Sequence, residues 1–245
     1  MKESTENALT LSRKEMHRIA SERVTEISKE FTEGFKFLED YPRSVTFFSG
    51  NQFREDNPYY TDARKLASRV VKELGYSVFS GGGPGIMEAA NRGAEEAGGN
   101  SLGLLIKLPN EQIVNKYITK EFSSYYFFVR KVFLSFSAEA FIFYPGGFGT
   151  LDEFFEILTL IQTRKIADVP LICVGSEYWN ELKKFMEKNM LSCGTIMPTD
   201  LNLFQIVDDH DQIIEIIRKV PVRIGVPYAG ANTKITLDEL KKQTL

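Results

Sequence analysis

The chain has 245 residues, with 30 Lys and Arg against 33 Asp and Glu, which gives a formal net charge of −3. Hydrophobic residues make up 43% and charged residues 26%, so a wholly disordered chain is excluded. Proteins that bind the nucleic-acid backbone show a basic excess, and this chain does not. No apolar run approaches the roughly 18–20 residues of a membrane span. The amino-terminal residues show no signal peptide. We therefore expect a cytoplasmic protein with no nucleic-acid and no membrane partner.

Cysteine and histidine are scarce. Cys173 and Cys193 are too few for a disulfide framework, and Cys173 lies in an apolar run typical of a buried strand. His17 and His210 occur in surface-like helical contexts without metal-ligand spacing and without a nucleophile motif nearby. We expect no metal and no cofactor, and acid–base chemistry then depends on carboxylates, Lys, Tyr or water.

The first part of the chain predicts a helix. Ser12 and Glu15 form a capping-box pattern, and apolar residues recur at helical spacing until Pro42. The spacing predicts a long amphipathic helix over residues 12–40 after a polar tail. This helix either docks on the rest of the protein or takes part in oligomer packing.

After Val45, short apolar runs alternate with helical stretches. The predicted strands are 45–50, 76–81, 102–108, 140–144, 170–175 and 204–209. The predicted helices are 58–74, 86–97, 127–137, 150–166, 179–190 and 212–219. Residues 110–126 show neither pattern, so we expect an irregular segment there that can cover a site.

This alternation predicts an α/β protein with a doubly wound parallel sheet, Rossmann-like, whose continuously apolar strands are buried on both faces. We expect a single domain with an N-terminal helical extension. The boundaries we predict are 1–43 for the tail and amphipathic helix, 44–220 for the nucleotide-binding catalytic domain, and 221–245 for a C-terminal tail.

Two glycine-rich turns follow predicted strands and open predicted helices, where ligands bind in such folds. The first contains Gly81, Gly82 and Gly83, and the second contains Gly146, Gly147, Gly149 and Thr150. Glycine allows close backbone approach, and a helix start presents free N–H groups to an anion, so a phosphate is the expected ligand. Neither turn has the spacing of a dinucleotide fingerprint or of a P-loop, which favours a mononucleotide or sugar phosphate.

Charged residues flank the second turn. Glu153 stands three positions after Thr150, beside Asp152 and near Glu156, so a carboxylate would lie next to the phosphate site. The same spacing suits a Thr-x-x-Glu capping box, and the two interpretations remain open. Arg130 and Lys131 lie in an aromatic stretch before the strand that leads into this turn, so we expect a partly buried and paired cation.

Three stretches of the chain resemble the Lonely Guy family: Phe127–Lys131, the later PGGFGTLDE, and SGGGPGIMEAANRGA at 80–94. Members of that family are often labelled possible lysine decarboxylases. They are better described as phosphoribohydrolases that release the base and ribose 5-phosphate from nucleoside 5′-monophosphates, including cytokinin nucleotides. The family is commonly dimeric.

The resemblance implies that Arg130 and Glu153 form the catalytic pair. It also implies that Gly146, Gly147, Gly149 and Thr150 bind phosphate. We assign Gly81, Gly82, Gly83 and Lys131 to substrate binding as well. Further candidates are Ser49, Gly50, Met87 and Glu88.

We therefore predict an N-glycosidase that cleaves nucleoside 5′-monophosphates such as AMP, CMP or cytokinin riboside monophosphates, and that forms a homodimer or a larger homo-oligomer. The alternatives are a non-catalytic nucleotide-binding or carrier protein on the same scaffold, and an interaction protein that uses the 12–40 helix. A pyridoxal phosphate decarboxylase fits poorly, because only Lys131 is at hand as a Schiff-base lysine.

Overall fold

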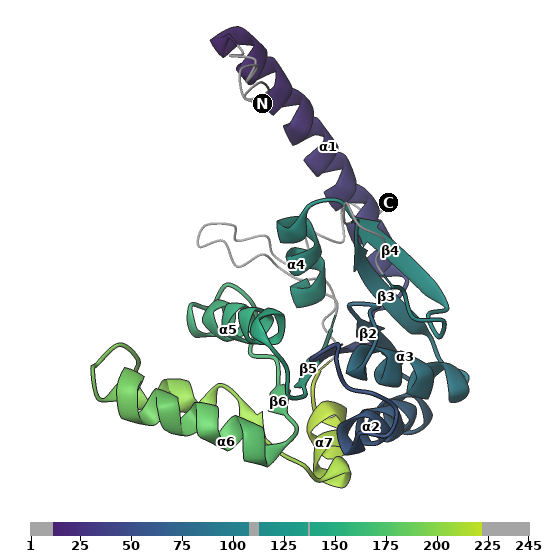
Figure 1. The fold of residues 1–245 in the computed structure, drawn as a ribbon, viewed down its shortest axis with the longest axis vertical. Helices are drawn as coiled ribbons and strands as arrows, with labels where there is room; N and C mark the ends of the chain where they lie inside the picture. The colour runs from purple at the N-terminus through teal and green to yellow at the C-terminus, as the bar shows by residue number, and fades with distance from the viewer. Residues whose placement is uncertain (1–11, 108–112, 137, 222–245) are drawn as a thin grey trace, which may run out of the picture.

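A parallel sheet of seven strands forms the centre of the protein (Figure 1). The structure, a computed structural model, describes residues 12–107, 113–136 and 138–221. In spatial order the strands are β4 (Lys120–Ser124), β3 (Ser101–Ile106), β2 (Ser77–Ser80), β1 (Ser44–Phe48), β5 (Ala140–Phe143), β6 (Leu171–Cys173) and β7 (Gln205–Ile206). Every neighbouring pair is parallel. The prediction of a doubly wound parallel sheet is confirmed.

Helices cover both faces of the sheet (Figure 1). One face carries α1 (Arg13–Glu39), α4 (Phe127–Phe136), α5 (Phe148–Gln162) and α6 (Ser176–Phe185). The other carries α2 (Pro58–Leu74), α3 (Ile86–Glu96) and α7 (His210–Arg218). Alternate residues of each strand serve the two cores, so Phe141 and Phe143 pack on the α5 side while Ala140 and Ile142 pack on the α2 side. Burial on both faces explains why these strands are continuously apolar.

The predicted 12–40 helix is α1, and its capping box between Ser12 and Glu15 is formed. Its amino-terminal part extends away from the sheet (Figure 1). Its second half docks on α4, where the Phe133 ring fills the space next to Gly34 that any larger side chain would need. Both oxygens of Glu30 accept the N–H of Tyr125 at 3.1 Å, just before α4 begins. A carboxylate at a helix amino terminus is favourable, so α1 supports the helix that contains Arg130.

The prediction that 110–126 is irregular is wrong for its second half, which contains β4. This strand lies at the edge of the sheet and pairs only with β3. Its sequence, Lys-Glu-Phe-Ser-Ser, is half-exposed and has one apolar residue, so it lacks the pattern of a buried strand.

Helices α5 and α6 differ most from their predicted bounds. Helix α5 ends at Gln162, not at Ile166, because Arg164 adopts a left-handed conformation (φ 58°) and the N–H of Lys165 bonds to the carbonyl of Leu160, a Schellman ending. Helix α6 begins three residues before Trp179, because Asp208 accepts the N–H groups of Gly175 and Ser176. A π-helical turn, Met186–Leu191, follows it.

Cys173 is buried, as its apolar run predicts. His210 is not a surface residue, because its side chain is only 16% exposed and faces Asp62 at 3.0 Å. No helix among the described residues is both long and apolar enough to cross a membrane. The predicted tail at 221–245 lies almost wholly outside the described residues, and all of the predicted tail before Ser12 does.

Candidate active site

The turns after β1, β2 and β5 meet at the carboxyl edge of the sheet. The N–H of Gly50, after β1, donates to the carbonyl of Pro145 at 3.2 Å. A Cβ on Gly146 would lie 2.7 Å from the nitrogen of Gly50, and one on Gly85 would lie 2.8 Å from its oxygen. The chain proceeds from β1 through β2 to β4 on one side and from β5 to β7 on the other. The three turns therefore surround the topological switch point, where open α/β sheets bind ligands.

The second glycine turn leads into α5 without a side-chain cap. Gly147 is the N-cap residue and supplies no side-chain cap, and within the described residues no side chain accepts the first N–H groups of the helix. A Cβ on either Gly147 or Gly149 would meet nothing within 4 Å. The helix start is thus open, with free N–H groups and the positive end of the helix dipole facing that space. This arrangement suits a phosphate.

The capping-box interpretation of Thr150 and Glu153 is wrong. With Thr150 as N-cap, the helix would begin at residue 151. It begins three residues earlier, because the glycine turn itself supplies Gly147 as N-cap. The N–H of Thr150 bonds to the carbonyl of Gly147 at 3.1 Å. Thr150 is buried beneath Gly146, whose lack of a side chain leaves room for the threonine hydroxyl. Glu153 is therefore free for another role.

Arg130 reaches the first glycine turn from α4. Its Nε donates to the carbonyl of Leu104 at 2.7 Å and its Nη2 donates to the carbonyl of Gly81 at 3.2 Å. Burial lowers the pKa of Arg130, while the charge of Glu153 opposes that shift. An arginine keeps its charge even so, and two of its five N–H donors are used here.

The prediction of a partly buried, paired cation is confirmed for Lys131, whose ammonium pairs with two carboxylates, and only in part for Arg130. Arg130 is mostly buried, but its partners are main-chain carbonyls, and in the described part of the chain no carboxylate lies within 4.0 Å of its guanidinium. Its positive charge is therefore available to an anionic ligand.

Glu153 lies one turn into α5, and its Oε2 is buried with no hydrogen-bond partner among the residues that the structure describes. Burial raises the pKa of Glu153 to about 7; Glu156 and Asp152 raise it further, and Lys131 and Arg130 lower it. A buried polar atom without a partner is costly and points to a group that is absent from the free protein. A carboxyl with a pKa near 7 exchanges protons readily at neutral pH.

Lys131 is paired with two carboxylates of α5. Its Nζ lies 2.9 Å from Asp152 and 2.5 Å from Glu156 on the outer side of α5. The two carboxylates hold this ammonium in place and link α4 to α5. Contact between Lys131 and a substrate stays a prediction.

The further candidates separate into two groups. Gly50 lies at the centre of the three turns, and the Met87 sulfur lies beside Gly81, where an added Cβ would be 2.9 Å from it. Glu88 instead accepts from the Tyr60 hydroxyl at 3.0 Å, toward α2. The Ser49 hydroxyl makes only a 3.5 Å contact with the next carbonyl.

Sequence reasoning missed the polar residues beneath the first glycine turn. Asn115 and Asn91 are buried and bonded to each other at 2.9 Å, and Asn115 also bonds to the carbonyls of Gly82 and Gly83. Asn91 could have been noticed in the sequence, because it is a lone polar residue on the small-residue face of the 86–96 helix. Asn115 gave no such signal, because it lies in a segment without periodicity.

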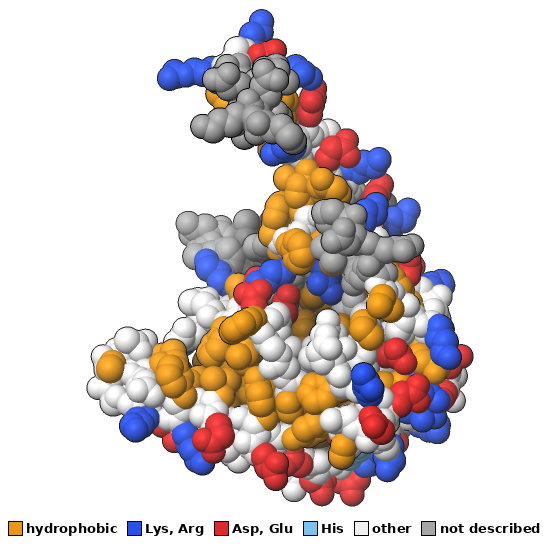
Figure 2. All heavy atoms as spheres, viewed as in Figure 1, with side chains coloured by type: hydrophobic (Ala, Val, Ile, Leu, Met, Phe, Trp, Pro, Cys, Tyr) orange, Lys and Arg blue, Asp and Glu red, His pale blue; other side chains and the backbone are white. Residues whose placement is uncertain are grey.

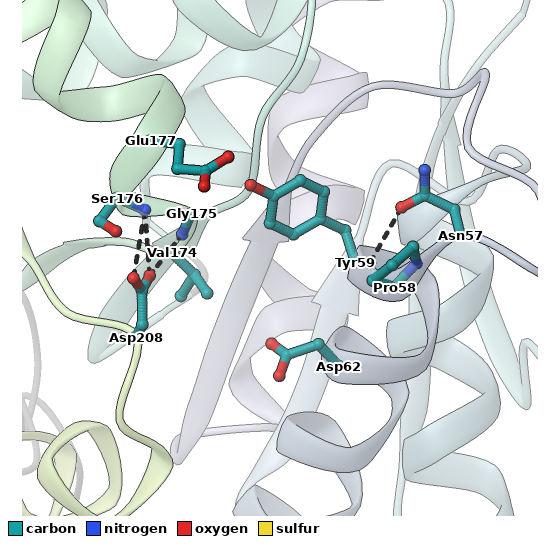
Figure 3. Close-up of a pocket in the computed structure, with 9 residues that line it drawn as sticks. All are labelled: Asn57, Pro58, Tyr59, Asp62, Val174, Gly175, Ser176, Glu177 and Asp208. Carbon is teal, nitrogen blue, oxygen red and sulfur yellow. Dashed lines mark hydrogen bonds between the residues drawn. The ribbon is translucent and has the colours of Figure 1, made fainter.

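A separate cavity of about 490 Å³ lies between the amino-terminal ends of α2 and α6 (Figure 3). It is lined by Asn57, Pro58, Tyr59, Asp62, Val174, Gly175, Ser176, Glu177 and Asp208. It includes neither Arg130 nor Glu153. Two of its carboxylates have protein partners: Asp62 accepts from the Tyr144 hydroxyl at 2.6 Å, and Asp208 accepts from backbone N–H groups. No cluster of three potential metal ligands is present among the described residues.

The fold and the site together define an open, Rossmann-like α/β protein with two glycine turns at its switch point. Residues 87–217 match the sequence model of a family described as possible lysine decarboxylase. This match covers more than half of the chain, and the chain belongs to that family.

Similar proteins include plant enzymes of the Lonely Guy type. The cytokinin riboside 5′-monophosphate phosphoribohydrolase LOG5 of Arabidopsis thaliana is 27% identical over 187 residues, which span 75% of this chain and 81% of the relative. The probable cytokinin riboside 5′-monophosphate phosphoribohydrolase LOGL6 of Oryza sativa subsp. japonica is 27% identical over 169 residues, 67% of each chain. The predicted resemblance to the Lonely Guy family is confirmed.

Solved structures share the fold. The molybdenum cofactor carrier protein of Chlamydomonas reinhardtii has a TM-score of 0.54 at 19% identity, covering 73% of this chain and 97% of that one. The molybdenum cofactor binding protein of Rippkaea orientalis has a TM-score of 0.53 at 21% identity, covering 73% and 96%. Such identities establish the common architecture alone.

Proposed function

We propose that this protein is a nucleoside 5′-monophosphate phosphoribohydrolase, with Arg130 and Glu153 as its catalytic pair. The observation that supports this most strongly is Glu153, a buried carboxyl with an unpartnered oxygen and a pKa of about 7 beside an uncapped helix start. The names of the plant relatives agree with it.

The proposed reaction breaks the bond between the base nitrogen and C1′ of the ribose. The 5′-phosphate binds at the start of α5, on the N–H groups around Gly147 and Gly149, and so positions the sugar. Bond breaking leaves positive charge on the sugar, which ionised Glu153 stabilises. Water then adds at C1′ and gives its proton to Glu153. Glu153 passes this proton to the nitrogen of the departing base, which restores the carboxylate. The products are the free base and ribose 5-phosphate.

Arg130 acts by charge and hydrogen bonding, because an arginine does not give up its proton at neutral pH. Its guanidinium is held by the carbonyls of Leu104 and Gly81, so its remaining N–H donors have a set direction. These donors bind the anionic or hydroxyl groups of the nucleotide.

The second candidate is a non-catalytic nucleotide-binding or carrier protein, since solved relatives in fold are named as cofactor carriers. Glu153 disfavours this candidate. A carboxylate next to a phosphate site repels an anionic ligand. A protein that only binds the nucleotide has no reason to retain such a carboxylate. A pyridoxal phosphate decarboxylase does not fit, because the Lys131 ammonium is held between two carboxylates, which keep it charged and unreactive toward an aldehyde.

Incubation with a panel of nucleoside 5′-monophosphates tests this proposal. We expect release of free base and ribose 5-phosphate from the monophosphates. We expect none from the matching nucleosides, which lack the phosphate anchor, and no cadaverine from lysine. Chromatography of base, sugar phosphate and amine measures all three. Nucleotide binding without base release would overturn the hydrolase and favour the carrier.

We also propose that the chain forms homo-oligomers through the outer face of α4 and α5. Figure 2 shows hydrophobic side chains gathered over α5, and Phe148 is 95% exposed at its start. Phe127 is 58% exposed and Phe128 is 50% exposed. A groove of about 530 Å³ runs along α5 from Phe148 to Leu160. Exposed apolar surface of this kind is typical of interfaces.

We expect Phe148→Asp to shift the sedimentation coefficient from that of an oligomer to that of a 27.9 kDa monomer, because a desolvated carboxylate in an apolar interface is costly. Phe185→Asp, at an aromatic on α6 that is 54% exposed, is the control and should leave the assembly unchanged. A wild-type protein that sediments as a monomer at high concentration would contradict the proposal.

A further inference from the structure

The first glycine turn has its three consecutive carbonyls bonded to the protein. The carbonyl of Gly81 accepts from Arg130 at 3.2 Å. The carbonyl of Gly82 accepts from the backbone N–H of Asn115 at 3.0 Å and from its side-chain Nδ2 at 3.1 Å. The same Nδ2 donates to the carbonyl of Gly83 at 3.1 Å. One buried asparagine thus holds two of the three carbonyls.

Asn115 is itself fixed by a buried network from several elements. Its Nδ2 also lies 2.9 Å from the Oδ1 of Asn91 on α3. That Oδ1 accepts from the Ser80 hydroxyl at 2.6 Å, and the Ser80 oxygen accepts from the N–H of Gly82 at 2.9 Å. Asn91 donates in turn to the Ser101 hydroxyl of β3 at 2.9 Å. Because each unmade bond of such a network is costly, it specifies one conformation of the turn.

This conformation determines which backbone groups face the site. With the carbonyls of residues 81–83 turned into the protein, the N–H of Gly83 has no partner within the described residues. Helix α3 likewise starts at Gly85 with no side-chain cap. Gly82 and Gly85 have positive φ values of 75° and 76°, and successive backbone N–H groups in such conformations form anion-binding concavities. A ligand therefore meets donors, not carbonyl oxygens.

We propose that Asn115 is a positioning residue for nucleotide binding: it draws the carbonyls of Gly82 and Gly83 away from the site, so that the turn offers N–H donors to a nucleoside monophosphate. This proposal rests on the proposed function and deepens it. Asn115 does not touch the substrate, and it acts through the glycine turn. It also couples residues 113–119 to the site, since its Oδ1 accepts the N–H of Tyr117 at 3.2 Å.

The test compares Asn115→Asp with Ser101→Ala. The first variant replaces the donating amide by a carboxylate, which repels the two carbonyls at nearly unchanged volume. The second removes the bond between Asn91 and Ser101 from the same buried network, yet touches no carbonyl of the turn. Comparing the two variants therefore distinguishes an effect on the conformation of the turn from a general loss of stability. Thermal unfolding measures the stability of both variants.

For steady-state hydrolysis of AMP, we expect Asn115→Asp to raise KM about tenfold with a smaller change in kcat, and Ser101→Ala to leave KM within about twofold. Hydrogen–deuterium exchange of the peptide spanning residues 81–86, in the free protein, should be faster in Asn115→Asp alone. Equal KM values in wild type and Asn115→Asp would overturn the proposal, as would equal exchange. A wild-type protein that neither binds nor cleaves AMP would instead contradict AMP as substrate, and the exchange measurement would still decide the role of Asn115.

Discussion

Glu153→Gln should lower kcat for nucleoside monophosphate hydrolysis by about 10³-fold, with KM changed only a fewfold. The amide keeps the shape of the side chain but removes the charge that stabilises the sugar cation and the base that accepts the proton of water. Binding should persist, because the proposed phosphate site at Gly147 and Gly149 is untouched. Steady-state kinetics together with calorimetric titration of AMP measures both quantities.

Asp152→Asn is the matched control, since Asp152 is the neighbouring carboxylate but is 63% exposed and points to Lys131. It should retain most of the activity. An active Glu153→Gln protein would remove Glu153 from the mechanism. Wild-type binding without turnover, unchanged in the variant, would favour the carrier.

The pH profile gives an independent signature of the same residue. Since the pKa of Glu153 is raised to about 7, wild-type kcat/KM should rise with pH through that value as the carboxylate ionises. Glu156→Gln should move this limb to lower pH, because it removes a negative neighbour. A limb that stays near 7 in Glu153→Gln would belong to another group.

As the pH rises, the contribution of Glu153 to stability should fall while the activity rises. A carboxyl whose pKa is higher in the folded protein contributes stability below its unfolded pKa of about 4.5 and loses it as pH rises through about 7. Above pH 7, the free energy of unfolding of Glu153→Gln should therefore exceed that of wild type by up to ~3 kcal/mol. Its unfolding temperature should be higher accordingly. The gain should vanish below pH 4.5.

Arg130→Lys should lower kcat/KM by at least about 10²-fold although the charge is kept. One ammonium cannot replace the planar guanidinium, which bonds to the carbonyls of Leu104 and Gly81 and still presents further donors. The variant should also lose about 1–3 kcal/mol of stability, because buried carbonyls lose their partners.

The matched control is Arg64→Lys, since Arg64 also makes two bonds, at 2.6 and 2.7 Å, but to Glu96 on the surface. Its variant should keep normal kinetics. Kinetics and thermal unfolding of both variants decide the question, and normal activity in Arg130→Lys would show that charge alone suffices at this position.

The sequence by itself determined six of the seven strands, most of the helices and the positions of the candidate residues. These features depend on local patterns: apolar runs for strands buried on both faces, helical spacing for α2 and α3, and glycines at the strand ends. Arg130 and Glu153 stood out because they flank the second turn at short range in the chain.

Only the tertiary structure decided how these residues are used. Strand β4 forms because β3 offers its edge, although Lys120–Ser124 has no pattern of its own. The start of α6 depends on Asp208, more than thirty residues away. Arg130 is held by carbonyls of β3 and of the first glycine turn, and Asn115 by that same turn. The pKa of Glu153 is raised because folding buries its carboxyl. Such contacts join residues distant in the chain, and burial and hydrogen bonding depend on surroundings that local propensity does not contain.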